Sequence, residues 1–185
     1  MLFYFFYFFY FFLLFSILIF LIFISFYTIS LIYSSFMGSP YVATKNKQVN
    51  LILKELRPKK GSIFYELGCG DAKLLRKAVK EYQVFGFGFD INPLLLWRAR
   101  FLAKKEGLKN IFFERKNILN INYQKVNYLY LFLLPKLIAK LQKKLNRQLP
   151  KNVVVVSHGF PILGWEKKLI KKIEERPFPT YFYKK

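Results

Sequence analysis

The sequence predicts an α/β protein with a mostly parallel sheet, preceded by one transmembrane helix. Three observations support this prediction. Beyond residue 40, short runs of β-branched and aromatic residues alternate with helical patterns, as in proteins built from strand–helix–strand units. A glycine loop follows the first of these runs and opens a helix. From Met1 to Thr44 the chain has no Asp, Glu, Lys or Arg and is almost entirely apolar.

The N-terminal segment is long enough to cross a bilayer once. A helix needs about 20 apolar residues to span the hydrocarbon core, and the apolar run extends from Met1 to Tyr33. No glycine or proline interrupts this run before Gly38, so a second span is not expected. The segment also lacks the basic start and the small-residue cleavage site of a signal peptide. We therefore expect a retained anchor whose hydrocarbon span is about Phe12 to Tyr33.

The charge of the chain is confined to the part that follows the apolar segment. All 31 basic and all 10 acidic residues lie beyond Thr44, and the formal net charge is +21. Such a charge favours anionic partners such as phosphate backbones, anionic lipid headgroups or acidic proteins, without choosing among them. Because basic residues flank the span only on its C-terminal side, we expect the domain to face the cytoplasm, or the matrix of an organelle. The protein should then be a single-pass membrane protein that contacts the bilayer through its N-terminal helix.

The elements of the domain are expected in alternating order. A lead-in helix should cover Lys47–Leu56 before the first strand. The expected strands, each a short run rich in Val, Ile, Phe or Tyr, are Ile63–Leu67, Val84–Phe89, Ile111–Glu114, Tyr128–Leu133 and Val153–Val156. The expected helices between them are Ala72–Tyr82, Pro93–Lys105 and Lys136–Gln148. A terminal hairpin should pair Lys168–Ile173 with Thr180–Tyr183.

The last of these helices shows the helical period most clearly. Leu137, Leu141 and Leu145 recur at every fourth position, and basic side chains occupy the opposite face. With these elements, the expected organisation is an anchor at residues 1–36 and a linker with the lead-in helix at residues 37–61. One domain then fills residues 62–185.

The glycine loop after the first strand, Gly68-Cys69-Gly70-Asp71, is expected to bind a ligand. The bare backbone N–H groups of such a loop, and the N-terminus of the helix after it, lie against the ligand. Asp90 ends the next strand, 20 residues after Gly70. At that distance a carboxylate accepts hydrogen bonds from the hydroxyls of a ribose. Together these features predict a nucleotide-like site.

The charges around the loop favour S-adenosylmethionine over other nucleotide cofactors. Asp71 would repel the pyrophosphate of a dinucleotide, and Lys73 stands where the dinucleotide pattern has a small residue. S-adenosylmethionine carries an ammonium and a sulfonium cation, for which Glu66 and Asp71 are favourable neighbours. No Gly-Lys-Ser/Thr follows the loop, which argues against a P-loop. Because the chain has one cysteine and one histidine, no metal site is expected.

Five blocks of the sequence resemble a known family. They are Pro40-Tyr41-Val42-Ala43-Thr44, Glu66–Asp71, Asp90-Ile91-Asn92-Pro93, Phe132–Pro135 and Phe160–Trp165. Their order and spacing resemble those of single-pass class I (Rossmann-like) methyltransferases. These enzymes methylate lysines in the c subunit of the mitochondrial ATP synthase and in the adenine nucleotide translocase, and they have prokaryotic relatives. The resemblance implies a Rossmann-like methyltransferase fold and methyl transfer from S-adenosylmethionine to a lysine of a membrane protein.

The loop chemistry and the resemblance together assign residues to the site. Those expected to bind the cofactor are Glu66, Gly68, Cys69, Gly70, Asp71, Asp90, Ile91 and Asn117. By resemblance, Tyr41 would cover the pocket, Pro135 and Trp165 would shape the acceptor channel together with Phe132, and Asn117 would take part in transfer. Ala43, Ala72 and Asn117 depart from the family pattern, which usually has proline, glycine and an acid at these positions. Asn117 keeps one carbonyl acceptor for an adenine amino group but lacks the carboxylate charge.

Three functions stay open at the level of sequence. The leading one is a membrane-tethered protein-lysine methyltransferase, since transfer to a neutral amine needs mainly alignment and a dry pocket. The second keeps the cofactor but moves the substrate to RNA or a small molecule, which would suit the charge of +21. Leu133-Leu134-Pro135 stands where an Asn-Pro-Pro-Tyr-type motif would be, which argues against the amide and exocyclic amine acceptors that this motif serves. The third is an anchored, non-catalytic module that binds S-adenosylmethionine, suggested by Asn117.

Overall fold

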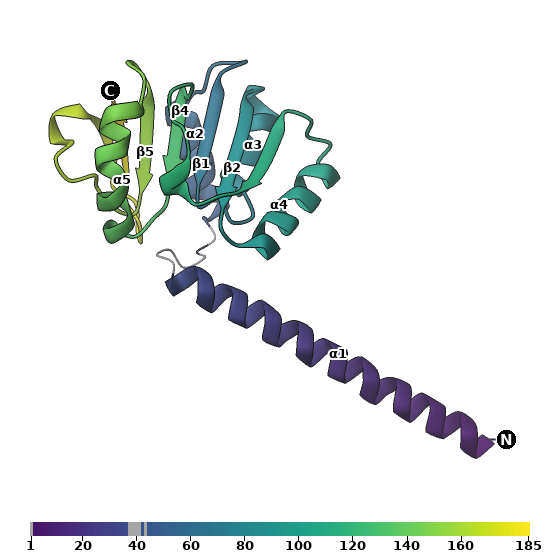
Figure 1. Ribbon diagram of the computed structural model, residues 1–185. Helices are drawn as coiled ribbons and strands as arrows, with labels where there is room; N and C mark the ends of the chain where they lie inside the picture. The colour runs from purple at the N-terminus through teal and green to yellow at the C-terminus, as the bar shows by residue number, and fades with distance from the viewer. Residues whose placement is uncertain (1, 37–41, 43) are drawn as a thin grey trace.

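The computed structural model describes residues 2–36, 42 and 44–185. Its first element is a long helix, α1 (Leu2–Phe36), and the elements after it build an α/β domain (Figure 1). The strands of the domain are β1 (Ile63–Leu67), β2 (Phe85–Asp90), β3 (Ile111–Arg115), β4 (Tyr128–Leu131), β5 (Val154–His158), β6 (Leu169–Ile173) and β7 (Thr180–Lys184). Its α-helices are α2 (Asn46–Leu56), α3 (Lys73–Tyr82), α4 (Pro93–Lys105) and α5 (Pro135–Gln148), and short 3-10 helices lie at Ile118–Asn120 and Glu166–Lys168.

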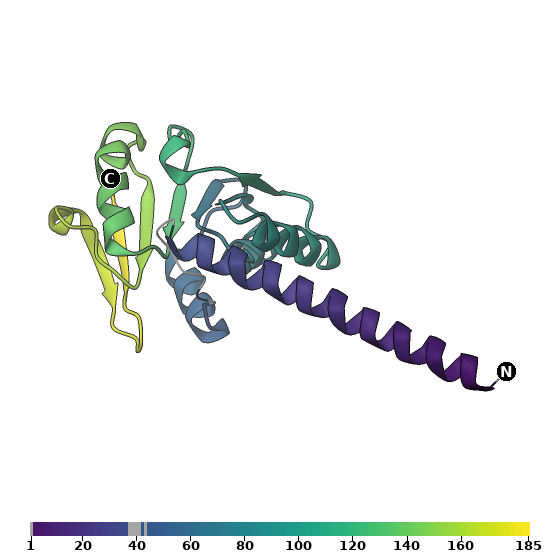
Figure 2. The ribbon, with the colours of Figure 1, turned by 60° about the horizontal axis from the view of Figure 1, so that its bottom comes forward.

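The seven strands form one sheet in the order β3-β2-β1-β4-β5-β7-β6. Strands β1 to β5 are parallel to one another, and β7 runs antiparallel to both β5 and β6. The β6–β7 hairpin lies at one side of the sheet, and β3 with α4 lies at the other (Figure 1, Figure 2). Because parallel strands end at the same edge, the loops after β1, β2 and β4 lie together there.

The predicted α/β class with a mostly parallel sheet is confirmed. Each predicted strand and helix of the domain is present, with bounds within two residues of the prediction, and the terminal hairpin is also formed. Strand β4 stops at Leu131 rather than Leu133, since α5 already begins at Pro135. Residues 132–134 therefore form a short connection at the edge where the parallel strands end.

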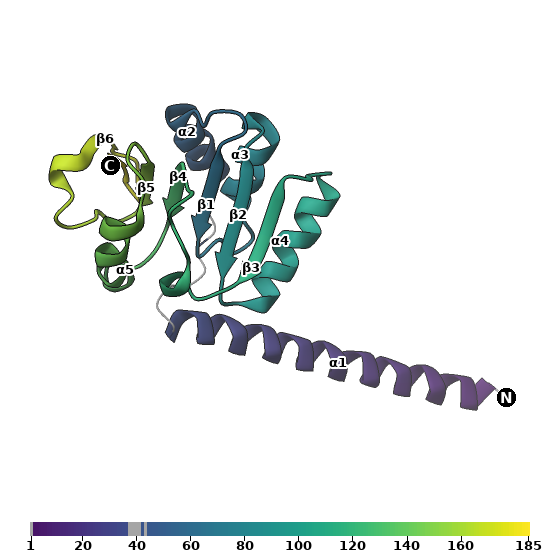
Figure 3. The same ribbon diagram turned by 45° about the horizontal axis from the view of Figure 1, so that its top comes forward.

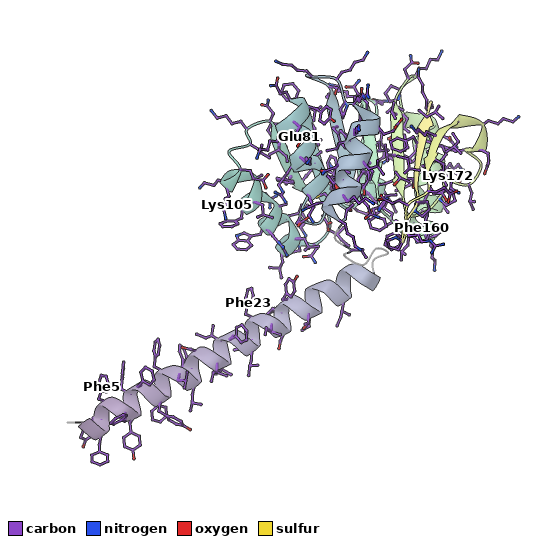
Figure 4. The ribbon with its side chains drawn as sticks, turned by 180° about the vertical axis from the view of Figure 1, so that it is seen from behind. Phe5, Phe23, Glu81, Lys105, Phe160 and Lys172 are labelled. Atoms are coloured by element: carbon purple, nitrogen blue, oxygen red, sulfur yellow. The ribbon has the colours of Figure 1, made fainter. Side chains whose placement is uncertain are left out.

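The two faces of the sheet are covered by different helices. Successive side chains of a strand point to opposite faces, so Phe64 and Leu67 of β1 belong to different core clusters. Phe64 packs in the cluster that contains α2, α3 and α4, and Leu67 packs in the cluster that contains α5. Figure 4 views the first of these faces, with Glu81 on α3 and Lys105 on α4.

Two glycines of β2 allow α3 and the glycine loop to approach the strand closely. A Cβ atom at Gly86 would lie 2.7 Å from Cγ2 of Val79 on α3, which is too close for any real contact. A Cβ atom at Gly88 would lie 2.8 Å from a ring carbon of Phe113 on β3 and 2.9 Å from the sulfur of Cys69 in the glycine loop. Strand β2 therefore accepts α3 at one of its glycines and the loop at the other.

Helix α1 is apolar on all sides and extends away from the domain, with side chains such as Phe5 and Phe23 exposed along it (Figure 4). Two of its serines bond within the helix: Ser16 donates to the carbonyl of Phe12 at 2.8 Å, and Ser25 to that of Leu21 at 2.9 Å. The stretch Phe3–Ile29 is long and apolar enough to cross a membrane. This candidate span begins nearer the N-terminus than the predicted span at Phe12–Tyr33.

Candidate active site

A cavity opens at the edge of the sheet where β1, β2 and β4 end. All eight residues that the sequence predicted as cofactor contacts line it, namely Glu66, Gly68, Cys69, Gly70, Asp71, Asp90, Ile91 and Asn117. They come from β1, the glycine loop, the end of β2 and the segment after β3. The topology thus brings together residues that are up to 51 positions apart, from Glu66 to Asn117 (117 − 66).

The glycine loop takes a backbone shape that explains its sequence. Gly68 and Gly70 have φ angles of +65° and +55°, which L side chains rarely adopt. A Cβ atom at Gly68 would also lie 3.0 Å from a methyl carbon of Leu133. The N–H of Cys69 donates to the carbonyl of Phe89 at 3.0 Å, so the loop is fixed to the end of β2. A larger residue at Gly68 would clash with the wall of the cavity.

Asp90 joins the glycine loop to the start of α4. One carboxylate oxygen accepts a hydrogen bond from the N–H of Gly70 at 2.9 Å, and the other accepts one from the N–H of Asn92 at 2.8 Å. Burial raises the pKa of Asp90 above its usual value, while these backbone N–H groups act in the opposite direction. Two carboxylate oxygens offer about four acceptor positions, so Asp90 retains capacity for hydroxyl donors in the cavity.

Glu66 is an acid buried against the first turn of α3. Its carboxylate accepts a hydrogen bond from the N–H of Leu75 at 3.1 Å. Burial raises the pKa of Glu66 to about 8, and the nearby carboxylates of Asp71 and Asp90 also raise it. At neutral pH and without a ligand, the cavity therefore favours the protonated form of Glu66. A cation bound in the cavity would favour the ionised form.

The segment that follows α1 contributes to the cavity wall. Val42 and Thr44 both line the cavity. The ammonium group of Lys73, in the first turn of α3, donates to the carbonyl of Thr44 at 3.0 Å. The hydroxyl of Thr44 lies 3.5 Å from that of Tyr130 on β4. Sequence reasoning noted Thr44 within a family block but gave it no role. Its contact with Tyr130 joins residues 86 positions apart and leaves no local pattern.

Aromatic rings line the part of the cavity beside β4, β5 and β7, which is its aromatic end. Phe132, Phe160 and Phe178 are part of its wall, and the rings of Phe132 and Phe178 are 5.1 Å apart. His158 lies behind them, 4.6 Å from the Phe132 ring, with its Nδ1 2.8 Å from the hydroxyl of Thr180. Burial lowers the pKa of His158 to about 4, so the imidazole is neutral. Phe178 was missed by sequence reasoning, since it lies in a proline-rich turn without a motif.

The residues predicted to take part in transfer are placed differently from one another. Tyr41 lies outside the described residues. Asn117 lines the cavity, but its side-chain oxygen accepts a hydrogen bond from the N–H of Leu119 at 2.9 Å and caps the 3-10 helix. Pro135 begins α5 and is not among the residues that line the cavity, whereas the preceding Leu134 is.

Trp165 lies in the protein core rather than in the cavity wall. Its side chain is fully buried, and its ring packs edge-on against Tyr183 at 5.7 Å. The indole N–H donates to the side chain of Asn146 at 2.9 Å. Trp165 is therefore not among the residues that line the cavity, and a part in shaping the acceptor channel stays a prediction. In the same block, Phe160 does line the cavity.

The parallel sheet and the cavity built on its glycine loop define the class of protein, a Rossmann-like methyltransferase. An RNA methyltransferase from Salinibacter ruber, crystallised with S-adenosyl-L-homocysteine, has a similar structure with a TM-score of 0.73 and 26% identity. The similarity covers 77% of this chain and 93% of that chain. The ribosomal protein L11 methylase from Lactobacillus delbrueckii shares the fold at 17% identity and a TM-score of 0.63, over 75% of this chain and 79% of the methylase.

Within this class, the chain belongs to the family of the ANTKMT methyltransferase domain, whose family model matches residues 66–169. It is 30% identical to a protein-lysine N-methyltransferase from Saccharolobus islandicus over 138 residues, which is 74% of this chain and 86% of that protein. It is 29% identical to the human lysine N-methyltransferase of the ATP synthase c subunit over 130 residues, 68% of this chain. The match covers about half, 54%, of the human protein. The predicted family resemblance is confirmed.

Proposed function

We propose that this protein is an S-adenosylmethionine-dependent protein-lysine N-methyltransferase that acts on a membrane protein. The observation that carries the proposal is the combination of three cavity carboxylates, Glu66, Asp71 and Asp90, with the glycine loop at one end of the cavity. A buried acid whose pKa is raised by burial favours a cationic ligand, because the cation offsets the cost of ionising the acid. The ammonium and sulfonium groups of S-adenosylmethionine satisfy this requirement.

The cofactor would supply a methyl group activated by a positive sulfur. Asp90 would accept hydrogen bonds from the ribose hydroxyls, and Glu66 and Asp71 would lie near the cationic groups. The backbone of the glycine loop would contact the ligand closely, because Gly68 and Gly70 carry no side chain. These residues would bind and orient the methyl donor.

The aromatic end of the cavity would receive the lysine. Phe132, Phe160 and Phe178 bear no charge and exclude water, so the amine would enter in its neutral form. The amine nitrogen would form a bond to the methyl carbon as the carbon–sulfur bond breaks, and the ammonium product would then lose a proton to water. Aromatic faces also stabilise the cationic product. The chain's own contribution would be alignment and a dry surface rather than a dedicated base.

We infer the membrane location of the protein and of its substrate from α1 and from the names of the relatives. The matched relatives include lysine N-methyltransferases of the ATP synthase c subunit and of the adenine nucleotide translocase. We infer that α1 anchors the protein in the bilayer and that the domain lies on the cytoplasmic or matrix side, since the cations follow the helix. Tethering raises the effective concentration of substrates that lie in the same membrane.

The proposal is tested by the identity of the methylated product. Purified full-length protein is incubated with methyl-labelled cofactor and membranes from cells that lack it. We expect label on a membrane protein, sensitive to protease and resistant to ribonuclease, with methyl-lysine found by mass spectrometry. The charge of +21 and the likeness to an RNA methyltransferase favour RNA as the second candidate substrate. Label that disappears with ribonuclease would establish RNA instead, and absence of any turnover would indicate a non-catalytic module.

A further inference from the structure

Helix α4 exposes a pair of large aromatic side chains. Trp97 is 66% exposed and Phe101 is 56% exposed, and their rings stack at 6.0 Å with an angle of 15°. The helix buries its other face, through Leu96, Ala99 and Ala103, against the sheet. The aromatic pair is therefore no part of the core, and a stacked, rigid apolar surface of this kind favours contact with another apolar phase.

The exposed part of the same helix also carries basic side chains. Its thirteen residues include Arg98, Arg100, Lys104 and Lys105 and no acid. Arg100 donates to the carbonyl of Phe113 at 2.8 Å. Arg98, Lys104 and Lys105 are exposed and form no ion pair with any described carboxylate. Tryptophan and phenylalanine with arginine and lysine beside them are typical of helices that lie in the surface of an anionic bilayer.

The position of α4 brings this surface close to the membrane that α1 would cross. Helix α4 begins at Pro93, directly after the cavity residues Asp90 and Ile91. The cavity is also lined by Thr44, which is eight residues beyond the end of α1 at Phe36. Eight residues span at most roughly 28 Å. Figure 3 shows that the edge at which the parallel strands end, where α4 begins, is on the side of the domain toward α1.

We propose that the exposed face of α4 is a second membrane contact, separate from the α1 anchor. Trp97 and Phe101 would lie at the level of the lipid headgroups, and Arg98, Lys104 and Lys105 would bind anionic lipid phosphates or carboxylates. This inference rests on α1 being an anchor, but not on the methyl transfer reaction. A symmetric contact between two copies through α4 is disfavoured, because it would bring the four cations of each helix against those of the other.

The two tryptophans of the chain provide a selective probe. Trp97 is 66% exposed and Trp165 is fully buried, so quenchers in the bilayer should reach only Trp97. The full-length protein is reconstituted without cofactor into vesicles of phosphatidylcholine and phosphatidylserine, with or without bromine on the acyl chains. We expect bromine to quench the emission of the wild type and to leave that of Trp97→Phe, which retains Trp165, unchanged. Equal emission of the wild type in brominated and ordinary vesicles would overturn the proposal.

Charge reversals test the contribution of the basic residues. The double variant Arg98→Glu with Lys105→Glu should show at least several-fold less quenching in vesicles that contain phosphatidylserine. The matched control is Lys140→Glu with Lys143→Glu on α5, which makes the same change of charge at exposed positions on the other face of the sheet. The control should keep the quenching of the wild type. Equal losses in both variants, or quenching that depends on protein concentration rather than on lipid, would contradict a lipid contact through α4. Because no methyl transfer is measured, these outcomes are independent of those for the proposed reaction.

Discussion

At the scale of single residues, the ionisation of Glu66 makes the charge of the cavity depend on pH. Burial raises its pKa to about 8, so the acid is mostly protonated at neutral pH when no ligand is bound. A cationic cofactor favours the carboxylate, and binding should therefore release a proton. We expect the affinity for S-adenosylmethionine to increase as the pH rises from about 6 to about 8. Titration calorimetry in buffers of different ionisation enthalpy measures the released proton. Glu66→Gln should bind more weakly and release fewer protons, and proton uptake by the wild type would contradict this assignment.

The same pKa affects the stability of the ligand-free fold. The pKa of Glu66 is about 8 in the folded chain and near 4.5 in a reference carboxyl. Stability due to the protonated acid is complete below the lower value and decreases as the pH rises toward the higher one. Glu66→Gln has no acid to ionise and keeps an acceptor for the N–H of Leu75. Its melting temperature relative to the wild type should therefore be higher at pH 8 than at pH 5. A constant difference between the two proteins would contradict the prediction.

Asp90 has a second role, in the shape of the loop as well as in binding. Its carboxylate holds the N–H groups of Gly70 and Asn92, and Asp90→Ala leaves both without this acceptor. We expect cofactor binding to weaken by about 1–3 kcal/mol, the usual cost when one side of a buried hydrogen bond is removed. Glu114→Ala is the control, since this acid is exposed on the neighbouring strand and pairs with Lys116. If calorimetry gives Asp90→Ala the same affinity as the wild type, Asp90 does not contribute to cofactor binding.

At the scale of elements, substitutions of the two glycines of β2 should have different effects on cofactor binding but similar effects on stability. Gly86→Ala would crowd Val79 on α3, and Gly88→Ala would crowd Cys69 in the glycine loop. Overpacking of this kind typically costs about 1–3 kcal/mol, so thermal denaturation should show a loss of stability in both variants. Only Gly88→Ala should also weaken cofactor binding, because its new methyl group would press on Cys69 in the loop as well as on Phe113 of β3. Equal binding losses in both variants would show that the effect is global.

The order and type of the elements could be predicted from the sequence, because each depends on a local pattern. Short apolar runs indicated β1 to β5, and the four-residue spacing of Leu137, Leu141 and Leu145 indicated α5. The eight predicted cofactor contacts meet at the cavity, since glycines and acids at strand ends converge at one edge of a parallel sheet. Their roles in binding stay predictions.

The acceptor end of the cavity was harder to predict than the cofactor end. Phe132 follows β4 and Phe178 precedes β7, with β5 between these strands in the sheet. Thr44 precedes α2, whereas Lys73 begins α3. Contacts between such residues depend on tertiary packing and have no spacing rule in the sequence. The place of Trp165 in a family block suggested the acceptor channel, whereas its side chain is buried in the core. Aromatic residues are so frequent in this chain that residue type alone does not distinguish a cavity wall from a packed interior.

At the scale of the whole molecule, we expect α1 to hold the protein in the membrane. The stretch Phe3–Ile29 has 27 residues, more than the roughly 20 that a span requires. Alkaline carbonate extraction should leave the full-length protein in the membrane fraction. Protease added to the outside of intact cells or organelles should not digest the domain, since the cations follow the helix. Release by carbonate would disprove the anchor, and digestion from outside would disprove the orientation.

The contact between Lys73 and Thr44 determines where the chain can be shortened. A water-soluble version that begins at α2 would lose Val42 and Thr44, although both belong to the predicted linker and not to the predicted domain. The ammonium of Lys73 would then lack its carbonyl acceptor beside the acidic end of the cavity. Solubility and an intact cavity are thus obtained together only if the cut falls before Val42. For preparative work, the end of α1 and the first described residue that lines the cavity, Val42, are only a few positions apart, so the chain between them is not a dispensable spacer.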